Sequence, residues 1–145
     1  MKVRLDTCAI AEIRKPEPDV AVIAALRAIP DEHLFLSVLT VGEIAKGIGQ
    51  LAAGKKRTKL TPWLAGPEGR FSERILSIDA GTGRTWGELT AIAAKRGHVI
   101  AAVDGLIAAT ALQHGLQVMT RNEGDFKATG VRVINPWQCD KGDGR

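Results

Sequence analysis

The sequence predicts a single α/β domain with a parallel sheet of four to five strands and helices on both faces. Short apolar runs typical of buried strands alternate along the chain with longer stretches whose apolar residues recur at helical spacing. Strands that alternate with helices in this way form parallel sheets that are covered on both sides. The length of 145 residues suits one domain with a core large enough to need no disulfides.

The first third of the chain supplies two of the strands. Pro16 and Pro18 end an early helical stretch, because proline lacks the backbone N–H that a helix interior needs. Ile44, Ile48 and Leu51 fall on one face of a later helix. The expected elements are a strand at Val3–Leu5, a helix at Thr7–Arg14, a helix at Asp19–Ile29, a strand at Leu34–Ser37 and a helix at Leu39–Ala53.

The rest of the chain continues the alternation. Gly97 and Gly115 each close a helix, since glycine favours the position just after a helix end. The expected elements are a helix at Lys55–Leu64 interrupted at Pro62, a strand at Arg74–Ile78, helices at Thr85–Arg96 and Asp104–His114, and strands at Gln117–Thr120 and Val131–Ile134. We expect the domain to occupy residues 1–137 and a frayed C-terminal tail to follow at residues 138–145.

Composition favours a soluble cytoplasmic protein. Apolar residues make up 45% of the chain and charged residues 25%, and no apolar run is long enough to span a bilayer. Met1 leads directly into the first expected strand, so we expect no signal peptide and no membrane partner. The formal net charge of +4, with a cluster at Lys55, Lys56, Arg57 and Lys59, suits a polyanion such as RNA.

Neither cysteine nor histidine offers a recognisable metal site. Cys8 and Cys139 lack the paired spacing of zinc ligands, and Cys8 follows an apolar strand as a small buried hydrophobe would. The three histidines, His33, His98 and His114, share no motif and are expected at the surface or at helix ends. Phosphate-cradling glycine loops and nucleophile elbows are also absent from the sequence.

Four acidic residues lie at joints between strands and helices: Asp6, Glu43, Asp104 and Asp125. An alternating strand–helix chain gathers such joints at one edge of its parallel sheet, where ligands bind in folds of this class. Four carboxylates brought together repel one another unless a cation lies between them. All-oxygen ligands suit Mg²⁺ or Mn²⁺ rather than zinc, and so indicate phosphoryl chemistry.

Each acid also has a local structural explanation. Asp6 or Thr7 could cap the helix that follows the first strand, and Asp104 could cap the nearly all-apolar helix that it begins. Capping and metal ligation need not exclude each other, because a carboxylate has about four lone-pair sites.

The other two acids could equally be surface residues. Glu43 could lie on a solvated helix face with Lys46 as a pair partner, and Asp125 could be an ordinary turn residue. The common edge of the sheet is what favours a shared site for all four.

Read together, these segments resemble the PIN-domain ribonucleases, and among them the VapC-type toxins of bacterial toxin–antitoxin pairs. The matching pieces run in the family's order from residue 1 to about residue 137. They are Leu5-Asp6-Thr7, Ser37 to Ile48 around Glu43, Asp104 to Ala111, Thr120-Arg121-Asn122 with Asp125-Phe126, and Asn135-Pro136-Trp137. One departure is Cys8, which stands where the family commonly has an asparagine able to hydrogen-bond near the site.

The resemblance implies a Mg²⁺-dependent endoribonuclease, usually dimeric and held inactive by a small antitoxin. It implies that Asp6, Glu43, Asp104 and Asp125 are the catalytic metal-binding acids, with Asp6 and Asp104 as central ligands. Candidates for holding the carboxylates in place are Thr7, Thr120 and Asn122. Candidates for contacting RNA phosphates are Arg14, Lys46 and Arg121. The tryptophans Trp63, Trp86 and Trp137 are expected in the core or a dimer interface rather than stacked on bases.

Three other functions were weighed. A catalytically silent RNA-binding module with the same fold would not need four clustered carboxylates. A phosphoaccepting receiver domain needs adjacent acids after its first strand and a lysine after a later one, whereas this chain has Leu5-Asp6 and Thr120-Arg121-Asn122. A phosphatase with two alternating aspartates after the first strand is excluded by Cys8.

Overall fold

A five-stranded, all-parallel sheet forms the centre of the protein, as the alternating pattern predicts. The computed structural model describes residues 2–14, 16–50 and 73–137, and its strands run in the order β3-β2-β1-β4-β5. The strands are β1 (Val3–Leu5), β2 (Leu34–Ser37), β3 (Ile75–Leu76), β4 (Gln117–Met119) and β5 (Val133–Ile134). The chain therefore builds outward from β1 in one direction and then returns to pair β4 on its other side.

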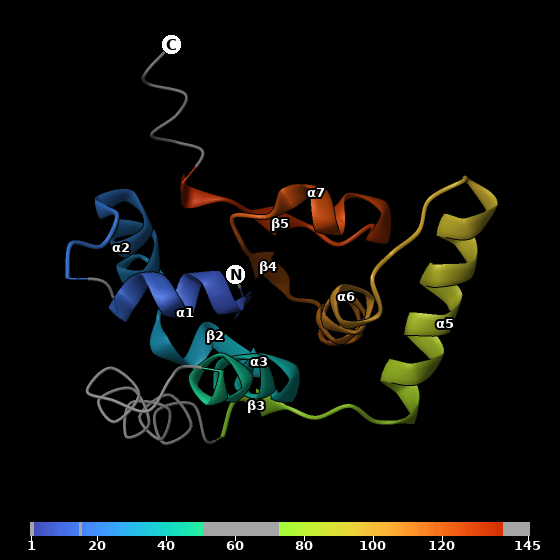
Figure 1. Ribbon diagram of the computed structural model, residues 1–145, viewed down its shortest axis with the longest axis horizontal. Coiled ribbons are helices and arrows are strands. Elements are labelled where there is room, and N and C mark those ends of the chain that lie inside the picture. The colour runs from blue at the N-terminus through green and yellow to red at the C-terminus, as the bar shows by residue number, and fades with distance from the viewer. Residues whose placement is uncertain (1, 15, 51–72, 138–145) are drawn as a thin grey trace, which may run out of the picture.

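Helices cover both faces of this sheet (Figure 1). They are α1 (Thr7–Arg14), α2 (Val20–Arg27), α3 (Val38–Gly49), α5 (Ala80–Lys95), α6 (Ala102–His114) and α7 (Glu123–Phe126), with short 3₁₀ helices η1 (Asp31–His33) and η2 (Lys127–Thr129). One apolar cluster packs α1 and α2 against one face. A second cluster packs α5, α6 and α7 against the other.

Side-chain alternation along the strands divides the core between these two clusters. Val118 belongs to the cluster under α6, whereas the next residue, Met119, belongs to the cluster under α1. The same alternation holds on β2, where Leu36 and Phe35 pack on opposite faces. Arg4 is aligned with Phe35 and Val118 across the sheet, so its side chain starts from the face that α6 covers.

Two helices begin earlier than the apolar pattern predicts. The start of α5 at Ala80, not Thr85, follows from a capping box, in which the Asp79 carboxylate accepts from the Thr82 N–H while the Thr82 hydroxyl accepts from the Asp79 N–H. Helix α6 begins at Ala102, so the expectation that Asp104 caps it is wrong. Its N-cap is Ala101, which makes no side-chain cap bond, and Asp104 lies within the first turn.

The remaining boundaries differ by a few residues, and strands β3 and β5 are shorter than expected. Several predictions concern segments outside the described residues. They are the helix at Lys55–Leu64, the position of Trp63, the basic cluster at residues 55–59, Cys139 and the tail at residues 138–145. The division at residue 137 therefore stays a prediction. Within the described ranges, no helix combines the length and apolar character needed to cross a membrane.

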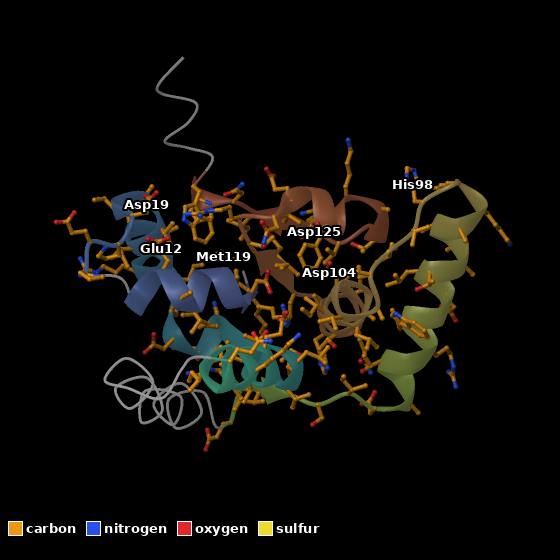
Figure 2. The ribbon with its side chains drawn as sticks, in the orientation of Figure 1. Glu12, Asp19, His98, Asp104, Met119 and Asp125 are labelled. Atoms are coloured by element: carbon orange, nitrogen blue, oxygen red, sulfur yellow. The ribbon has the colours of Figure 1, made fainter. Side chains whose placement is uncertain are left out.

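A buried carboxylate ties the two ends of the described chain together. Glu12 on α1 is 3% exposed. It accepts hydrogen bonds from the Asp19 backbone N–H at 2.9 Å and from the Trp137 indole N–H at 3.0 Å, and it pairs with Arg121 at 3.5 Å. Figure 2 shows Glu12 and Asp19 close together between α1 and α2. Trp137 is buried in the core, as its type predicts, and Arg121 lies over its ring.

Replacing this carboxylate should destabilise the fold. Glu12→Ala leaves the Asp19 and Trp137 N–H groups without their acceptor, at a cost of about 1–3 kcal/mol for each buried donor. Glu12→Gln keeps an acceptor oxygen and should lose less. Urea unfolding of the three proteins measures the difference, and an unchanged midpoint in Glu12→Ala would contradict the assigned role.

Candidate functional site

The site is organised where β1 and β4 end side by side. Asp6 follows β1 directly, and its backbone N–H donates to the Met119 carbonyl of β4 at 3.1 Å. Its side chain is only 8% exposed and accepts a hydrogen bond from the Thr120 hydroxyl at 2.9 Å. Because β1 and β4 lie on either side of the point where strand order reverses, these residues occupy the crevice in which α/β folds bind ligands.

Thr120 links this first acid to the segment that carries another. Its hydroxyl oxygen, while donating to Asp6, accepts from the Asn122 backbone N–H at 3.1 Å. The Asn122 carbonyl in turn accepts from the Asp125 N–H at 3.1 Å, within the start of α7. Thr120 is fully buried, so this chain of contacts fixes the turn between β4 and α7 relative to Asp6.

Asp104 faces the other acids from the first turn of α6. Burial raises the pKa of its carboxyl group, and the charges of Asp125, Asp6 and Glu43 raise it further. Figure 2 shows Asp104 on α6 and Asp125 on α7 close to one another. The four carboxylates therefore share one electrostatic field, although they come from four separate segments.

A buried arginine, Arg4, which the sequence did not lead us to expect, lies close to these acids. Arg4 on β1 is fully buried and donates from Nη2 to the hydroxyl oxygen of Thr40 on α3. Burial lowers the pKa of Arg4 to about 10, against the opposing influence of Asp6 and Glu43. Glu43 itself is exposed and lies one helical turn beyond Thr40. The guanidinium thus stays charged at neutral pH, and its charge interacts with those of Asp6 and Glu43.

The donor set fits a hard divalent cation in chemistry and in charge. All four side chains offer carboxylate oxygens, and repulsion among them is relieved by an ion of opposite sign. Among the described residues, no three Asp, Glu, His or Cys side chains are gathered closely enough to hold an ion as they stand. Completing a coordination shell would require the exposed carboxylates of Glu43 and Asp125 to turn inward.

Two hollows flank the acids. The larger, of about 760 Å³, reaches from Asp104 and Asp125 along α5 and η2, and its walls include Arg96, His98 and Lys127. Its other side chains are mainly apolar. The smaller, of about 500 Å³, lies along α3 beside Glu43 and Lys46 and meets the start of α6 at Val103. The acids thus lie between two open depressions rather than in a closed cavity.

The supporting residues named from sequence have different surroundings. Thr120 contacts Asp6 through its side chain, whereas the contact of Asn122 with Thr120 comes from its backbone. Lys46 lines the smaller hollow. Arg121 pairs with Glu12 and lies 5.0 Å above the Trp137 ring. The side chains of Thr7, Cys8 and Arg14 lie outside the described part of the chain, so their roles stay predictions.

Sequence reasoning missed Arg4 and Glu12, as well as the larger hollow with Arg96 and Lys127. A signal for Arg4 was present, because a charged residue within an apolar buried strand demands a partner. Glu12 had no such signal, since an acid in an amphipathic helix normally faces water. The hollow depends on how α5, α6 and η2 pack, which a single sequence does not specify.

Comparisons with known proteins place the chain in a family. The family model described as "PIN domain" matches residues 3–131. The curated "VapC ribonuclease Y4jK" of Sinorhizobium fredii is 42% identical over 142 residues, covering 92% of this chain and 96% of the relative. "Toxin FitB" of Neisseria gonorrhoeae is 40% identical over 136 residues, covering 93% and 98%. A solved structure of FitAB bound to a DNA fragment superposes with a TM-score of 0.87 at 38% identity, covering 93% of this chain and 95% of the solved one.

The raised pKa of Asp104 predicts a pH-dependent loss of stability. Its folded-state pKa lies above the unfolded value near 4, so protonation favours the fold. In chelator, the free energy of unfolding should therefore fall as pH rises from about 4 through the folded-state pKa, and then level off. Asp104→Asn should flatten this fall, and thermal unfolding between pH 4 and pH 7.5 measures it.

A matched variant separates this effect from a general change in charge. Glu88 is exposed on α5 and outside the acidic cluster, so Glu88→Gln should keep the wild-type pH dependence. Asp79, whose pKa is lowered to about 2 mainly by the hydrogen bond from the Thr82 N–H, is present in all three proteins and so does not contribute to the difference between them. A fall in stability that persists in Asp104→Asn would mean that another group causes it.

Proposed function

Because this chain belongs to the PIN-domain family, with VapC- and FitB-type proteins among its relatives, we propose that it is an endoribonuclease toxin. It would hydrolyse RNA phosphodiester bonds with the help of Mg²⁺, or Mn²⁺ in its place. The single observation that supports the proposal most is the raised pKa of Asp104, which burial raises first and the charges of Asp125, Asp6 and Glu43 raise further. Four mutually repelling acids suit a cation site and have no use in a module that only binds RNA.

Asp6 and Asp104 are the proposed central ligands of the ion. Asp6 is held in place from the side of β4 by Thr120, and Asp104 lies in the first turn of α6. Glu43 and Asp125 are exposed and would orient water molecules or complete the coordination. A bound Mg²⁺ would supply Lewis acidity, polarising the scissile phosphate and favouring hydroxide over water.

The protein's own residues would position the substrate rather than form bonds to it. Asp125 lines the larger hollow and Glu43 lines the smaller one. An RNA strand laid across the cluster would place its neighbouring phosphates near Lys46 in one hollow and near Arg96 and Lys127 in the other. Arg14 and Arg121 stay predicted phosphate contacts. Attack of a water oxygen on the phosphorus would break the opposite P–O bond, with one water proton passing to solvent and the leaving oxygen taking up a proton from solvent.

The proposal includes a small antitoxin as partner. One relative, 40% identical, is named as a toxin, and a similar solved structure is that of FitAB bound to a DNA fragment. A homodimer and a cytoplasmic site of action belong to the same proposal, the latter because RNA is the substrate. The acidic cluster would bind a cationic side chain of the antitoxin, most favourably arginine, whose planar fork pairs bidentately with carboxylates.

Cleavage should require a divalent cation and Asp6. We expect the purified protein to cut single-stranded or looped RNA with Mg²⁺ or Mn²⁺ and to stop in excess EDTA. Asp6→Asn should lower the rate by more than about 100-fold, since removing groups that only orient metal ligands already costs about 10–100-fold. The amide oxygen can still accept from Thr120, so the fold should persist. Mapping of new RNA ends gives the rates, and circular dichroism checks the fold.

Two further variants calibrate this result. Thr120→Val removes the hydroxyl that holds Asp6 and should cost about 10–100-fold in activity. Glu88→Gln should cut as fast as wild type. If Asp6→Asn stays within a few-fold of wild type, Asp6 has only a structural role. A wild-type protein that binds RNA without cutting it would support the silent RNA-binding module instead.

Inhibition by the antitoxin should depend on the charge of the acidic cluster. Calorimetric titration of the toxin with its co-expressed antitoxin is expected to show at least about 10-fold weaker binding for Asp104→Asn, because a buried charge pair loses one member. Replacing the antitoxin's inserted arginine by alanine should have a similar effect. A structure of the complex in which the four acids stay open to solvent would contradict this mode of inhibition.

A further inference from the structure

The burial of Arg4 is unusual for its surroundings. Its neighbours in register on β2 and β4 are Phe35 and Val118, and both are apolar residues that face the cluster under α6. An apolar side chain at this position would fill the same layer without losing hydration. A fully buried guanidinium instead loses several kcal/mol of hydration free energy, on the order given by ion burial in proteins. Some compensating interaction must therefore hold it there.

Hydrogen bonding alone does not account for that compensation. The guanidinium donates to Thr40 through Nη2. Among the described residues, neither Nε nor Nη1 has a hydrogen-bond acceptor, although both atoms are buried. The residue keeps its charge at neutral pH, and the two groups whose charges favour that state are Asp6 and Glu43.

The positions of Asp6 and Glu43 explain why their charges interact with that of Arg4. Asp6 lies two residues after Arg4, so both side chains leave the strand toward the same face. Thr40 and Glu43 are three residues apart on α3, so Glu43 lies on the same side of that helix as the residue that Arg4 contacts. Arg4 is thus anchored between β1 and α3, underneath the acidic cluster and shielded from solvent.

We propose that Arg4 is a built-in counter-cation of the acidic cluster, which keeps Asp6 and Glu43 together without a metal and weakens the binding of divalent ions. With all four acids ionised, the cluster carries a charge of about −4, and Arg4 reduces it to about −3. The positive charge also repels an entering ion. The inference rests on the proposed metal site for its second half only, since the interaction with Glu43 exists without any metal.

A double-mutant cycle tests the first half. Met is close to Arg in length and uncharged, so the cycle compares wild type, Arg4→Met, Glu43→Gln and the double variant by thermal unfolding in EDTA at pH 7.5. Removing the Glu43 charge should raise the melting temperature more in the Arg4→Met background than in wild type, because the favourable charge of Arg4 is missing there. The cycle cancels the cost of burying Arg4 itself. Equal shifts in both backgrounds would overturn the proposal.

Folding failure is also informative. If Arg4→Met does not fold but Arg4→Met with Glu43→Gln does, the charge balance is confirmed as the reason for Arg4. If neither folds, the guanidinium serves packing and its bond to Thr40, and the counter-cation assignment is wrong.

Calorimetric titration with Mn²⁺ tests the second half. Arg4→Met should bind the ion at least about 10-fold more tightly than wild type, because a buried positive charge near the site has been removed. Arg27→Met makes the same change in net charge on α2, which packs on the opposite face of the sheet, and should leave the affinity unchanged.

The outcomes separate this inference from the proposed function. Affinity in Arg4→Met that equals or falls below wild type would overturn the effect of Arg4 on metal binding. If neither wild type nor Arg4→Met binds Mn²⁺, the metal site itself is refuted. The double-mutant cycle with Glu43 would still decide whether Arg4 is a counter-cation.

Discussion

The parallel pairing of β1 with β4 is the constraint on which the site depends. It brings together residues more than a hundred positions apart in sequence, and it places the end of β1 at the reversal of strand order. The bond from Thr120 to Asp6 spans this pair and extends through Asn122 to α7. A ligand that contacts Asp6 therefore meets a group whose position is set by the two central strands. In the proposed metal-assisted hydrolysis, a fixed position of this carboxylate would matter because the reaction depends on holding charges in place.

Much of this arrangement followed from the sequence. The alternation of strands and helices predicted the parallel sheet, and a parallel sheet places the joints after β1 and β4 at one edge. The early start of α5 was missed because an apolar pattern does not report a capping box, which depends on Asp79 and Thr82 three residues apart. Asp104 was expected as an N-cap because helix-capping residues and metal ligands share the same chemistry. The structure separates the two roles only because Ala101 takes the cap position.

Other features could not be predicted, because they depend on packing between distant segments. The partners of Glu12 come from α2, the end of β4 and Trp137, and no local pattern connects these residues. The hollow lined by Arg96 and Lys127 likewise exists only when α5, α6 and η2 are assembled. Arg4 is an intermediate case, since its sequence position shows that a charge is buried but not which acids compensate it.

The four acids differ in burial, and this difference separates the two proposed central ligands from the other two acids. Asp6 is nearly buried and held by Thr120, and Asp104 is half-buried in the first turn of α6. Glu43 and Asp125 are exposed on the two flanks. Burial raises the pKa of Asp104, and repulsion from Asp125, Asp6 and Glu43 raises it further. The exposed acids keep their hydration and could approach an ion in the proposed site. Only these two acids would then have to move when an ion binds.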